Sequence, residues 1–397
     1  MVNAMRLALL VIIAVVLALT IYHKHTDCMD HQNKSKVIGI WWGIYSDYWS
    51  SEKDVWCKQV DEVFKMLSDI GINTIFFLAK DPWGFTYYNS SIAPLSPKYS
   101  WDPLEYIVNK ALEYNISVNV YVNALAEGET TPSPWLSKHR DIALRDRYGN
   151  VIGWMDPEAE EARARILSVV EEIVKNYPIE GIQLDRIRYP NRDAYGIVSR
   201  NKFIQIYNID PSYSRDLWDS FRRNSVSEIV RLTYEKVKSI KPEVKVSAAV
   251  FPVYNLAGYG SSYRYQLQDW KRWVEEGWLD YVVTMAYTGD VDKFKVYVDD
   301  EINTVSGKVP LLVGIYLGYD TKTIADELKY ALSSNVDGVV FFNVDLLIKD
   351  PGKAEAIKSI IQGENIEENS VNNRYIILAG LLVVAIAILY GWIIRRK

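Results

Sequence analysis

Residues 180–190 read EGIQLDRIRYP. We expect residues 180–185 to form a short buried strand that ends at Asp185, because runs of this kind recur along the chain at similar length. Arg186, Arg188 and Tyr189 follow directly. A cation beside a carboxylate favours its ionised form. The stretch therefore predicts a strand that presents an ionised carboxylate and two cations at its carboxyl end, and a structural Asp–Arg pair is the alternative.

Seven more runs of β-branched and aromatic residues resemble this one. They are residues 37–42, 73–79, 116–122, 244–251, 279–286, 310–316 and 337–343. Several are apolar on both alternating faces, which is typical of strands covered on two sides. Stretches with helical spacing lie between them. Eight strands alternating with helices predict an α/β fold of the (β/α)₈ TIM-barrel type. An open doubly wound sheet is the alternative, and it usually shows a glycine-rich phosphate loop that is absent here.

The predicted helices have recognisable start and stop signals. They span residues 53–69, 103–113, 157–177, 216–240, 265–276, 321–334 and 351–361. Gly71 is expected to end the first of them, and Asp102-Pro103 and Asp156-Pro157 are expected to open two others. Long insertions follow three strands, at residues 80–100, 123–155 and 186–215. In a barrel these insertions lie on the C-terminal face, where active sites are built.

The composition excludes several classes of protein. The chain has 397 residues, a net charge of −5, 2 Cys and 4 His, so a disulfide framework and a structural zinc site are not expected. Excess acid also speaks against a nucleic-acid partner. We expect no metal and no cofactor. The 28 Tyr and 13 Trp supply flat rings that suit sugar faces and ordinary cores alike.

Two hydrophobic segments flank the barrel region. Residues 7–22, behind Arg6, predict a signal peptide or an uncleaved signal anchor within residues 1–30. Residues 375–394 are uncharged and long enough to span a bilayer, and the basic tail 395–397 that follows is expected on the cytoplasmic side. We therefore expect a barrel domain at 31–361 on the extracellular side, joined by a polar stalk at 362–374 to a transmembrane helix in the cell membrane.

Acidic residues near the predicted strand ends are candidates for paired carboxylate chemistry, which cleavage of a glycosidic bond requires. Asp185 is the first of them. Its candidate partners are Asp290, Asp320, Asp345, Asp81 and Glu127. We favour Asp290 as the acid/base, and a helix cap or a loop turn is the alternative for each of these partners. The residues expected to bind substrate are Trp41, Trp42, Asp81, Asn123, Arg186, Arg188, Tyr189, Tyr254, Tyr287 and Asp345. Trp83 is a further rim aromatic that could stack on a sugar.

The order of several segments resembles that of the TIM-barrel glycosidases grouped as glycosyl-hydrolase-like family ten. The matching segments are GIWWG at 39–43, NTIFFLAKDPWGFTYYNS at 73–90, DPLEYIVNKALEYNISVNVYVN at 102–123, WMDPEAEEAR at 154–163, EGIQLDRIRYP at 180–190, FRRNSVSEIV at 221–230 and GWLDYVVTMAY at 277–287. The resemblance covers about residues 37–345. It implies hydrolysis of a glycosidic bond, with Asp185 as the residue carried over.

This chain departs from the family pattern at three positions. Glu180 replaces the first Asp of the signature, Arg186 replaces the second of two paired acids, and Thr284 stands where the family has proline. The resemblance and the residues together predict a membrane-anchored extracellular glycoside hydrolase that acts on an oligo- or polysaccharide. Asp185 would be its nucleophile or electrostatic stabiliser. The loss of the second acid motivates the alternative, a catalytically retired barrel that binds carbohydrate or serves the cell envelope.

Overall fold

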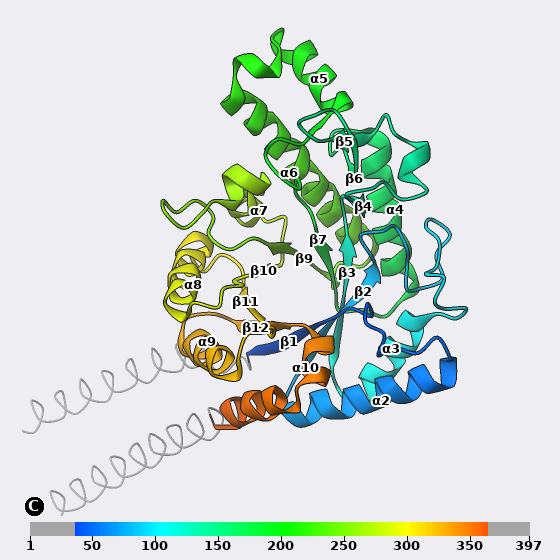
Figure 1. Cartoon of the computed structure of the whole chain (residues 1–397), viewed down its shortest axis with the longest axis vertical. Coiled ribbons are helices and arrows are strands. Elements are labelled where there is room, and N and C mark those ends of the chain that lie inside the picture. Colours follow the sequence, from blue (N-terminus) through cyan, green and yellow to red (C-terminus); the bar gives the residue numbers. More distant parts are fainter. Residues whose placement is uncertain (1–35, 364–397) are drawn as a thin grey trace, which may run out of the picture. The chain divides into compact units, whose positions relative to one another are not determined.

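A computed structural model describes residues 36–363, and these residues form a closed barrel of eight parallel strands (Figure 1). The strands are β1 (Val37–Trp42), β2 (Thr74–Lys80), β3 (Ser117–Asn123), β7 (Gly181–Asp185), β9 (Lys245–Val250), β10 (Tyr281–Thr284), β11 (Leu311–Tyr316) and β12 (Gly338–Phe342). They neighbour one another in chain order, and β12 closes against β1. The predicted fold class and all eight predicted strands are confirmed.

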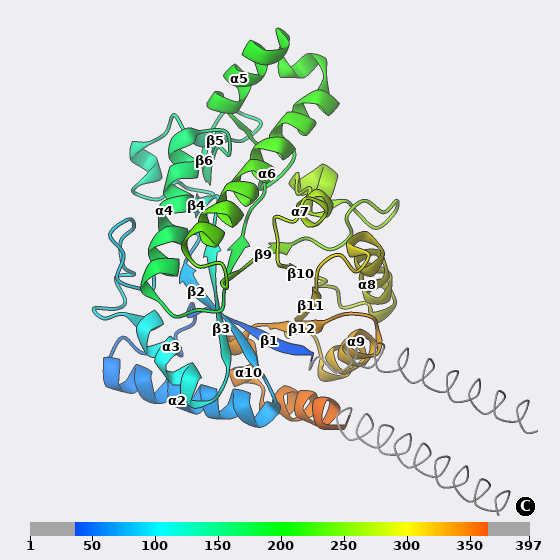
Figure 2. The ribbon, with the colours of Figure 1, turned by 180° about the vertical axis from the view of Figure 1, so that it is seen from behind.

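The barrel helices pack against the outside of the strands (Figures 1 and 2). They are α2 (Lys53–Ile70), α3 (Pro103–Glu113), α4 (Glu160–Asn176), α6 (Arg215–Ile240), α7 (Trp270–Glu275), α8 (Val291–Val305), α9 (Thr321–Ser333) and α10 (Val344–Lys349). Gly71 ends α2 in the left-handed conformation at φ 98°, as expected. The Asp102 carboxylate caps α3 by accepting a hydrogen bond from the Glu105 amide.

Two predicted helix starts are wrong, and each has a local cause. Helix α4 begins at Glu160, because Asp156 accepts from the backbone amides of Glu158 and Ser199 instead of capping the helix. Helix α7 begins at Trp270, because Leu267 takes a left-handed conformation at φ 54° after a separate π-helical turn, η3 (Ser262–Gln266). Helix α8 was not expected at all.

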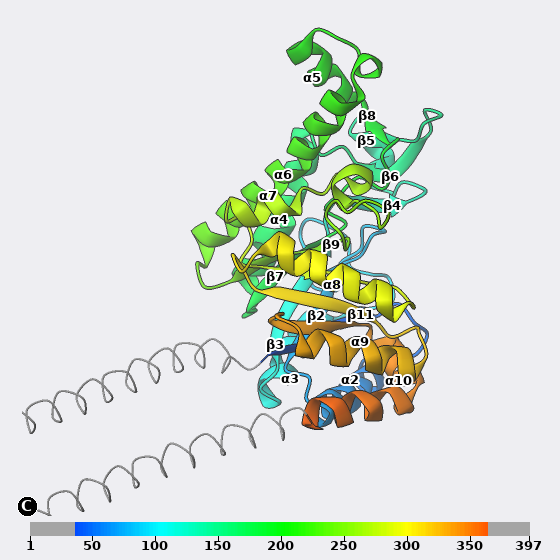
Figure 3. The ribbon, with the colours of Figure 1, turned by 90° about the vertical axis from the view of Figure 1, so that its left-hand side faces the viewer.

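The insertions after β3 and β7 build a small second sheet on the C-terminal side of the barrel. Its strands are β4 (Ala126–Glu129), β6 (Val151–Met155), β5 (Ala143–Arg145) and β8 (Tyr195–Gly196), in that order across the sheet. Helix α5 (Ile197–Tyr207) follows β8 and packs at the far end of α6 (Figure 3). Buried Asp156 accepts two hydrogen bonds from Ser199 on α5. These bonds attach the insertion after β7 to the segment that precedes α4.

The last described segment is helical from residue 351 to residue 363 and lies next to the carboxyl-terminal end of α2 (Figures 1–3). An ion pair of 2.8 Å joins Lys358 to Asp69 across these helices. The predicted signal segment, the polar stalk and the 375–394 span lie outside the described residues. Within residues 36–363, every helix is too short or too polar to cross a membrane.

Two fully buried glutamates predict a pH dependence of stability. Glu301 on α8 accepts one hydrogen bond, from Thr284, and Glu327 on α9 has no partner among the described residues. Burial raises the pKa of each carboxyl to about 8 from an ordinary value of 4.5. The folded chain therefore keeps protons that the unfolded chain releases. The contribution of these two carboxyl groups to stability is fully present below pH 4.5 and is lost as the pH rises to about 8.

We expect Glu327→Gln to make the free energy of unfolding less dependent on pH. Its decrease between pH 5 and pH 8 should be smaller in the variant than in the unaltered chain by more than about 1 kcal/mol. Urea unfolding at several pH values measures it. The matched control is Glu243→Gln, an exposed position before β9 that should leave the slope unchanged. Equal slopes for Glu327→Gln and the unaltered chain would contradict the prediction.

Candidate active site

A cavity with a volume of about 270 Å³ opens at the carboxyl ends of the barrel strands. Its lining comes from strands or strand ends on several sides of the barrel and from the loops after β1 and β2. The lining residues are Trp41, Tyr45, Pro82, Trp83, Tyr121, Asn123, Asp185, Arg186, Arg188, Ala249, Met285, Tyr287 and Phe342. The cavity lies where (β/α)₈ enzymes place their active sites.

Asp185 is the last residue of β7, and among the described lining residues it carries the sole carboxylate. Its Oδ1 accepts a hydrogen bond of 2.6 Å from the Arg186 amide and lies 3.6 Å from Nη1 of Arg188. Its side chain remains 24% exposed, so part of it is accessible from the cavity. The arrangement holds a charged oxygen at the cavity wall, with a cation at its side.

The two arginines extend from Asp185 toward the second sheet. Arg186 has a left-handed backbone at φ 50°, and its guanidinium forms a 2.6 Å ion pair with Glu129 at the end of β4. Both guanidinium groups lie 5.9 Å from the ring centroid of Trp154 on β6. Burial lowers the pKa of Arg188, and the neighbouring Asp185 opposes that shift. This wall of the cavity is therefore cationic, and Glu129 is the acidic group tied to it.

Aromatic side chains line the cavity opposite and beneath Asp185. The Trp41 indole donates a hydrogen bond of 2.7 Å to the Gln183 amide oxygen inside the barrel. Its ring contacts the Tyr287 ring edge-on, with the ring centroids 6.4 Å apart. Burial raises the pKa of Tyr287 well above 10, and the nearby Asp185 charge adds to the shift. Burial has the same effect on Tyr121, which is hydrogen-bonded to Tyr45. These phenols therefore stay protonated at neutral pH and can donate and accept hydrogen bonds.

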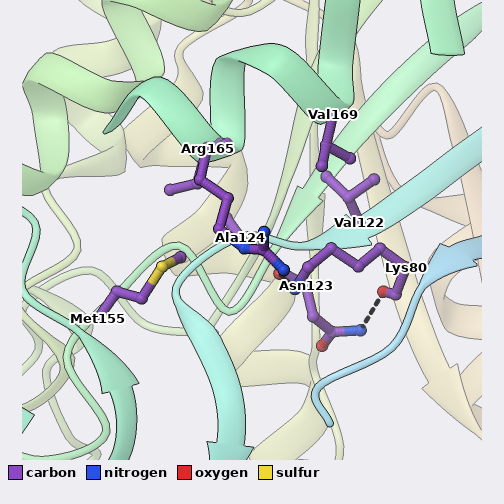
Figure 4. A pocket seen from close by; sticks show the side chains of 8 residues that line it. Lys80, Val122, Asn123, Ala124, Met155, Arg165 and Val169 are labelled. Atoms are coloured by element: carbon purple, nitrogen blue, oxygen red, sulfur yellow. Dashed lines mark hydrogen bonds between the residues drawn. The ribbon is translucent and has the colours of Figure 1, made fainter. Parts of the chain in front are cut away.

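Behind the cavity wall lies a buried ion cluster made of Lys80, Glu127 and Arg165. Glu127 is fully buried and contacts Lys80 Nζ at 3.1 Å and Arg165 Nε at 2.9 Å. Lys80 also donates to the carbonyls of Asn123 and Ala126. Figure 4 shows Lys80, Asn123 and Arg165 around a small pocket, with the Asn123 amide bonded to the Lys80 carbonyl at 3.0 Å. The cluster joins β2, β3, β4 and α4 behind the site.

The structure brings together part of the predicted site. The predicted residues that line the cavity are Trp41, Asn123, Asp185, Arg186, Arg188 and Tyr287. Asp290 is not among them: its carboxylate accepts hydrogen bonds from the amides of Asp292 and Lys293 and caps α8. The helix-cap alternative therefore describes its position, because a short acidic side chain just before a helix satisfies the free amides of the first turn. Asp320 caps α9 in the same way.

Five other predicted binding residues lie outside the lining of this cavity. Trp42 and Tyr189 are fully buried, Trp42 against Phe64 and Tyr189 beneath Arg222. Asp345 is 7% exposed and accepts a hydrogen bond from the Trp49 indole. Asp81 is 2% exposed and accepts three hydrogen bonds in its own loop. The Tyr254 hydroxyl donates to Asp269, outside the cavity lining. These five side chains are therefore buried in the core or hydrogen-bonded to nearby residues instead of facing the cavity.

Sequence reasoning missed Tyr45, Tyr121, Met285 and Phe342 in the lining. A signal was present for Tyr121. Side chains alternate between the two faces of a strand, so Tyr121 shares the face of Asn123, which was predicted to point into the site. Tyr45 comes from the loop after β1. Its position depends on contacts with Trp83 and Tyr121, which the local sequence pattern does not predict.

Solved structures with a similar fold include two carbohydrate-active proteins. The glycoside hydrolase domain of PgaB (BpsB) from Bordetella bronchiseptica aligns with a TM-score of 0.61 at 11% identity, covering 82% of this chain and 98% of that one. Alpha-L-fucosidase isoenzyme 2 from Paenibacillus thiaminolyticus aligns with a TM-score of 0.61 at 16% identity, covering 84% and 50%. At these identities the likeness establishes the barrel fold alone.

Curated proteins match at the level of sequence. Glycosyl hydrolase DigH of Escherichia coli (strain K12) is 27% identical over 56% of this chain and 56% of its own length. Glycosyl hydrolase YngK of Bacillus subtilis is 27% identical over 60% of this chain and 51% of its own length. The chain thus spans about half the length of these relatives. The model of the family described as glycosyl hydrolase-like 10 matches residues 37–333, nearly the whole barrel. With its barrel and its strand-end aspartate, the chain belongs to the glycosyl hydrolase-like 10 family.

Proposed function

We propose that the chain is a glycoside hydrolase that cleaves an oligo- or polysaccharide, with Asp185 as nucleophile or electrostatic stabiliser. One observation carries the proposal: Asp185 stands at the carboxyl end of β7, partly exposed, in an aromatic-lined cavity of a glycosyl hydrolase-like barrel. A carboxylate in this position can stabilise the positive charge that develops on the sugar ring during glycosidic cleavage.

The surrounding groups suit a polyhydroxylated ligand. Arg186 and Arg188 both line the cavity, and a guanidinium group can donate hydrogen bonds to sugar hydroxyls. Tyr121 and Tyr287 add neutral hydroxyls, and Trp41 adds an apolar ring at the cavity wall. Arg188 also holds the Asp185 carboxylate at the position where charge develops. No cofactor enters this chemistry.

We also propose that the protein is anchored in the cell membrane, with the barrel on the extracellular side. The uncharged run at 375–394 is long enough to span a bilayer, and residues 395–397 directly after it are Arg, Arg and Lys. By the positive-inside rule these cations stay in the cytoplasm, which leaves the preceding barrel outside. Fusion of a reporter to the carboxyl terminus, followed by protease treatment of intact cells, tests this topology.

A second candidate function is carbohydrate binding without hydrolysis. Two features of the cavity favour it. Among the described residues that line the cavity, Asp185 is the sole one with a carboxylate. Arg186 occupies the position of the family's second acid. A glycosidase that uses two carboxylates needs a second one within reach of the bond. A sugar-binding barrel needs only the donors and rings described above.

One experiment separates the two functions. The full chain and its Asp185→Asn variant are incubated with α- and β-linked oligosaccharides, and new reducing ends are measured beside binding of the same sugars by calorimetry. Reducing ends released by the unaltered chain alone support the hydrolase. Binding by both proteins without release supports the sugar-binding function. If no sugar of the panel is bound and none is cleaved, both functions are contradicted.

A further inference from the structure

Trp83 lies at the edge of the cavity and, with its neighbour Tyr45, is more exposed than the other aromatic residues of the lining. It is 46% exposed, whereas Trp41 is 3% exposed. The Tyr45 ring meets the Trp83 ring edge-on, with centroids 5.7 Å apart and planes at 80°, and Tyr45 is itself 41% exposed. A T-shaped contact places the edge of one ring against the face of the other, so it leaves at least one face of the indole uncovered by Tyr45. Trp83 therefore offers an open apolar face beside the ligand cavity.

The backbone that carries Trp83 is tightly fixed. Asp81 Oδ1 accepts hydrogen bonds of 2.9 Å from the amides of both Trp83 and Phe85, and Tyr87 donates to Asp81 Oδ2. The Pro82 carbonyl accepts a 2.6 Å bond from the Gly128 amide of β4. A ring held on such a turn loses little conformational entropy when it binds a ligand. A single exposed aromatic residue is normal on protein surfaces, but one on a rigid turn that lines a cavity is a candidate binding platform.

The buried ion cluster also supports this turn. Gly84 adopts a left-handed φ of 93°, and a Cβ there would lie 2.5 Å from Oε2 of the buried Glu127. The turn thus rests directly on the cluster of Glu127, Lys80 and Arg165. The ring of Trp83 is held at a fixed place relative to β3 and β7, the strands that end in Asn123 and Asp185. A fixed spacing between a deep site and a platform at the edge is what recognition of two linked sugars requires.

We propose that Trp83 forms a second sugar subsite at the mouth of the cavity. It lies next to the subsite in which a bound sugar contacts Asp185, and it selects pyranoses with equatorial substituents. The inference rests on the proposed function. In a gluco-configured ring the hydroxyls are equatorial, so axial C–H bonds point from the ring face toward the negative face of the indole. An axial hydroxyl, such as O2 of mannose, interrupts one of the two apolar faces, so such a ring can stack on the indole only through its other face.

The subsite makes affinity depend on chain length. A monosaccharide fills the deep site alone, whereas a longer oligosaccharide also covers Trp83. We test this in the full-length Asp185→Asn background, which prevents turnover, with glucose, cellotetraose, N-acetylglucosamine, chitotetraose, mannose and β-1,4-mannotetraose as probes. Binding is followed by calorimetry and by tryptophan fluorescence. We expect the gluco-configured tetrasaccharides to bind at least about tenfold more tightly than their monosaccharides, as a well-placed aromatic contact provides.

Trp83→Ala should remove this gain and leave monosaccharide affinity within about twofold, and Trp83→Phe should restore part of it. Trp278→Ala, at the amino end of β10 and outside the cavity lining, is the matched control and should keep the gain. Equal tetrasaccharide affinity with and without Trp83, or equal losses for mono- and tetrasaccharides, would overturn the subsite and leave the proposed function standing. Absence of binding and hydrolysis by the parent chain would overturn both.

Discussion

Asp185→Asn is expected to lower hydrolysis of any substrate that the unaltered chain cleaves by about 10³-fold or more, which corresponds to about 4 kcal/mol of transition-state stabilisation. The amide is nearly isosteric with the carboxylate but carries no charge. It can neither attack the anomeric carbon nor stabilise the cationic ring. Initial rates of reducing-end release, measured at saturating and limiting substrate, give the change in kcat and in kcat/KM separately.

The same variant should fold normally. The Asp185 side chain is 24% exposed, and an Asn oxygen can still accept the 2.6 Å hydrogen bond from the Arg186 amide. We expect the free energy of unfolding to change by less than about 1 kcal/mol, as for a weak, partly exposed ion pair. Activity within tenfold of the unaltered chain would show that Asp185 does not take part in the chemistry, while a large loss of stability would assign it a structural role.

Glu127→Ala is expected to destabilise the fold by about 3–5 kcal/mol, because it removes one partner from a buried ion cluster. Lys80 and Arg165 have side-chain exposures of 4% and 6%, so both cations would remain buried without their common carboxylate. The turn that carries Trp83 rests on Glu127 and should become mobile as well. Urea unfolding monitored by circular dichroism measures the stability change. A loss below 1 kcal/mol would contradict this reading of the cluster.

The cluster also predicts a loss of stability in acid. Burial alone would raise the pKa of Glu127, but Lys80 and Arg165 outweigh it and hold the pKa below its ordinary value of 4.5. The folded chain therefore binds this proton less readily than the unfolded chain. The stabilisation is present above pH 4.5 and is lost as the pH falls through the lowered pKa. Glu127→Ala should make the free energy of unfolding less dependent on pH below about 4.5.

Glu171→Ala is the control, because it breaks surface ion pairs with Lys175 and Lys236. It should lower the free energy of unfolding by less than about 1 kcal/mol.

The arrangement of elements could be predicted because it depends on local patterns. Each barrel strand is a short run of apolar residues, and such runs have few alternatives to burial between two layers. The end of α2 at Gly71 and the cap of α3 at Asp102 depend on single residues with strong conformational preferences. The start of α4 could not be predicted in this way, because Asp156 bonds to Ser199, which lies 43 positions away.

The site could be predicted only in part, and the reason is the same. Asp185 is at a strand end by sequence alone, and strand ends of a barrel converge on one face. Asp290 and Asp81 also follow strands, yet their oxygens accept amide hydrogen bonds from their own neighbouring residues. Sequence position places a carboxylate near the rim, but competition between local amides and the cavity decides which one remains available.

The sequence by itself determined the barrel, the family and the place of Asp185, because burial pattern, turn residues and strand ends are local properties. Only the tertiary structure decided which side chains share the cavity. Tyr45, Trp83 and Tyr121 meet Asp185 there from separate loops and strands, and Glu127 lies behind the turn that carries Trp83. Such contacts join residues far apart along the chain, and their geometry depends on how loops close and pack, which no single stretch of sequence specifies.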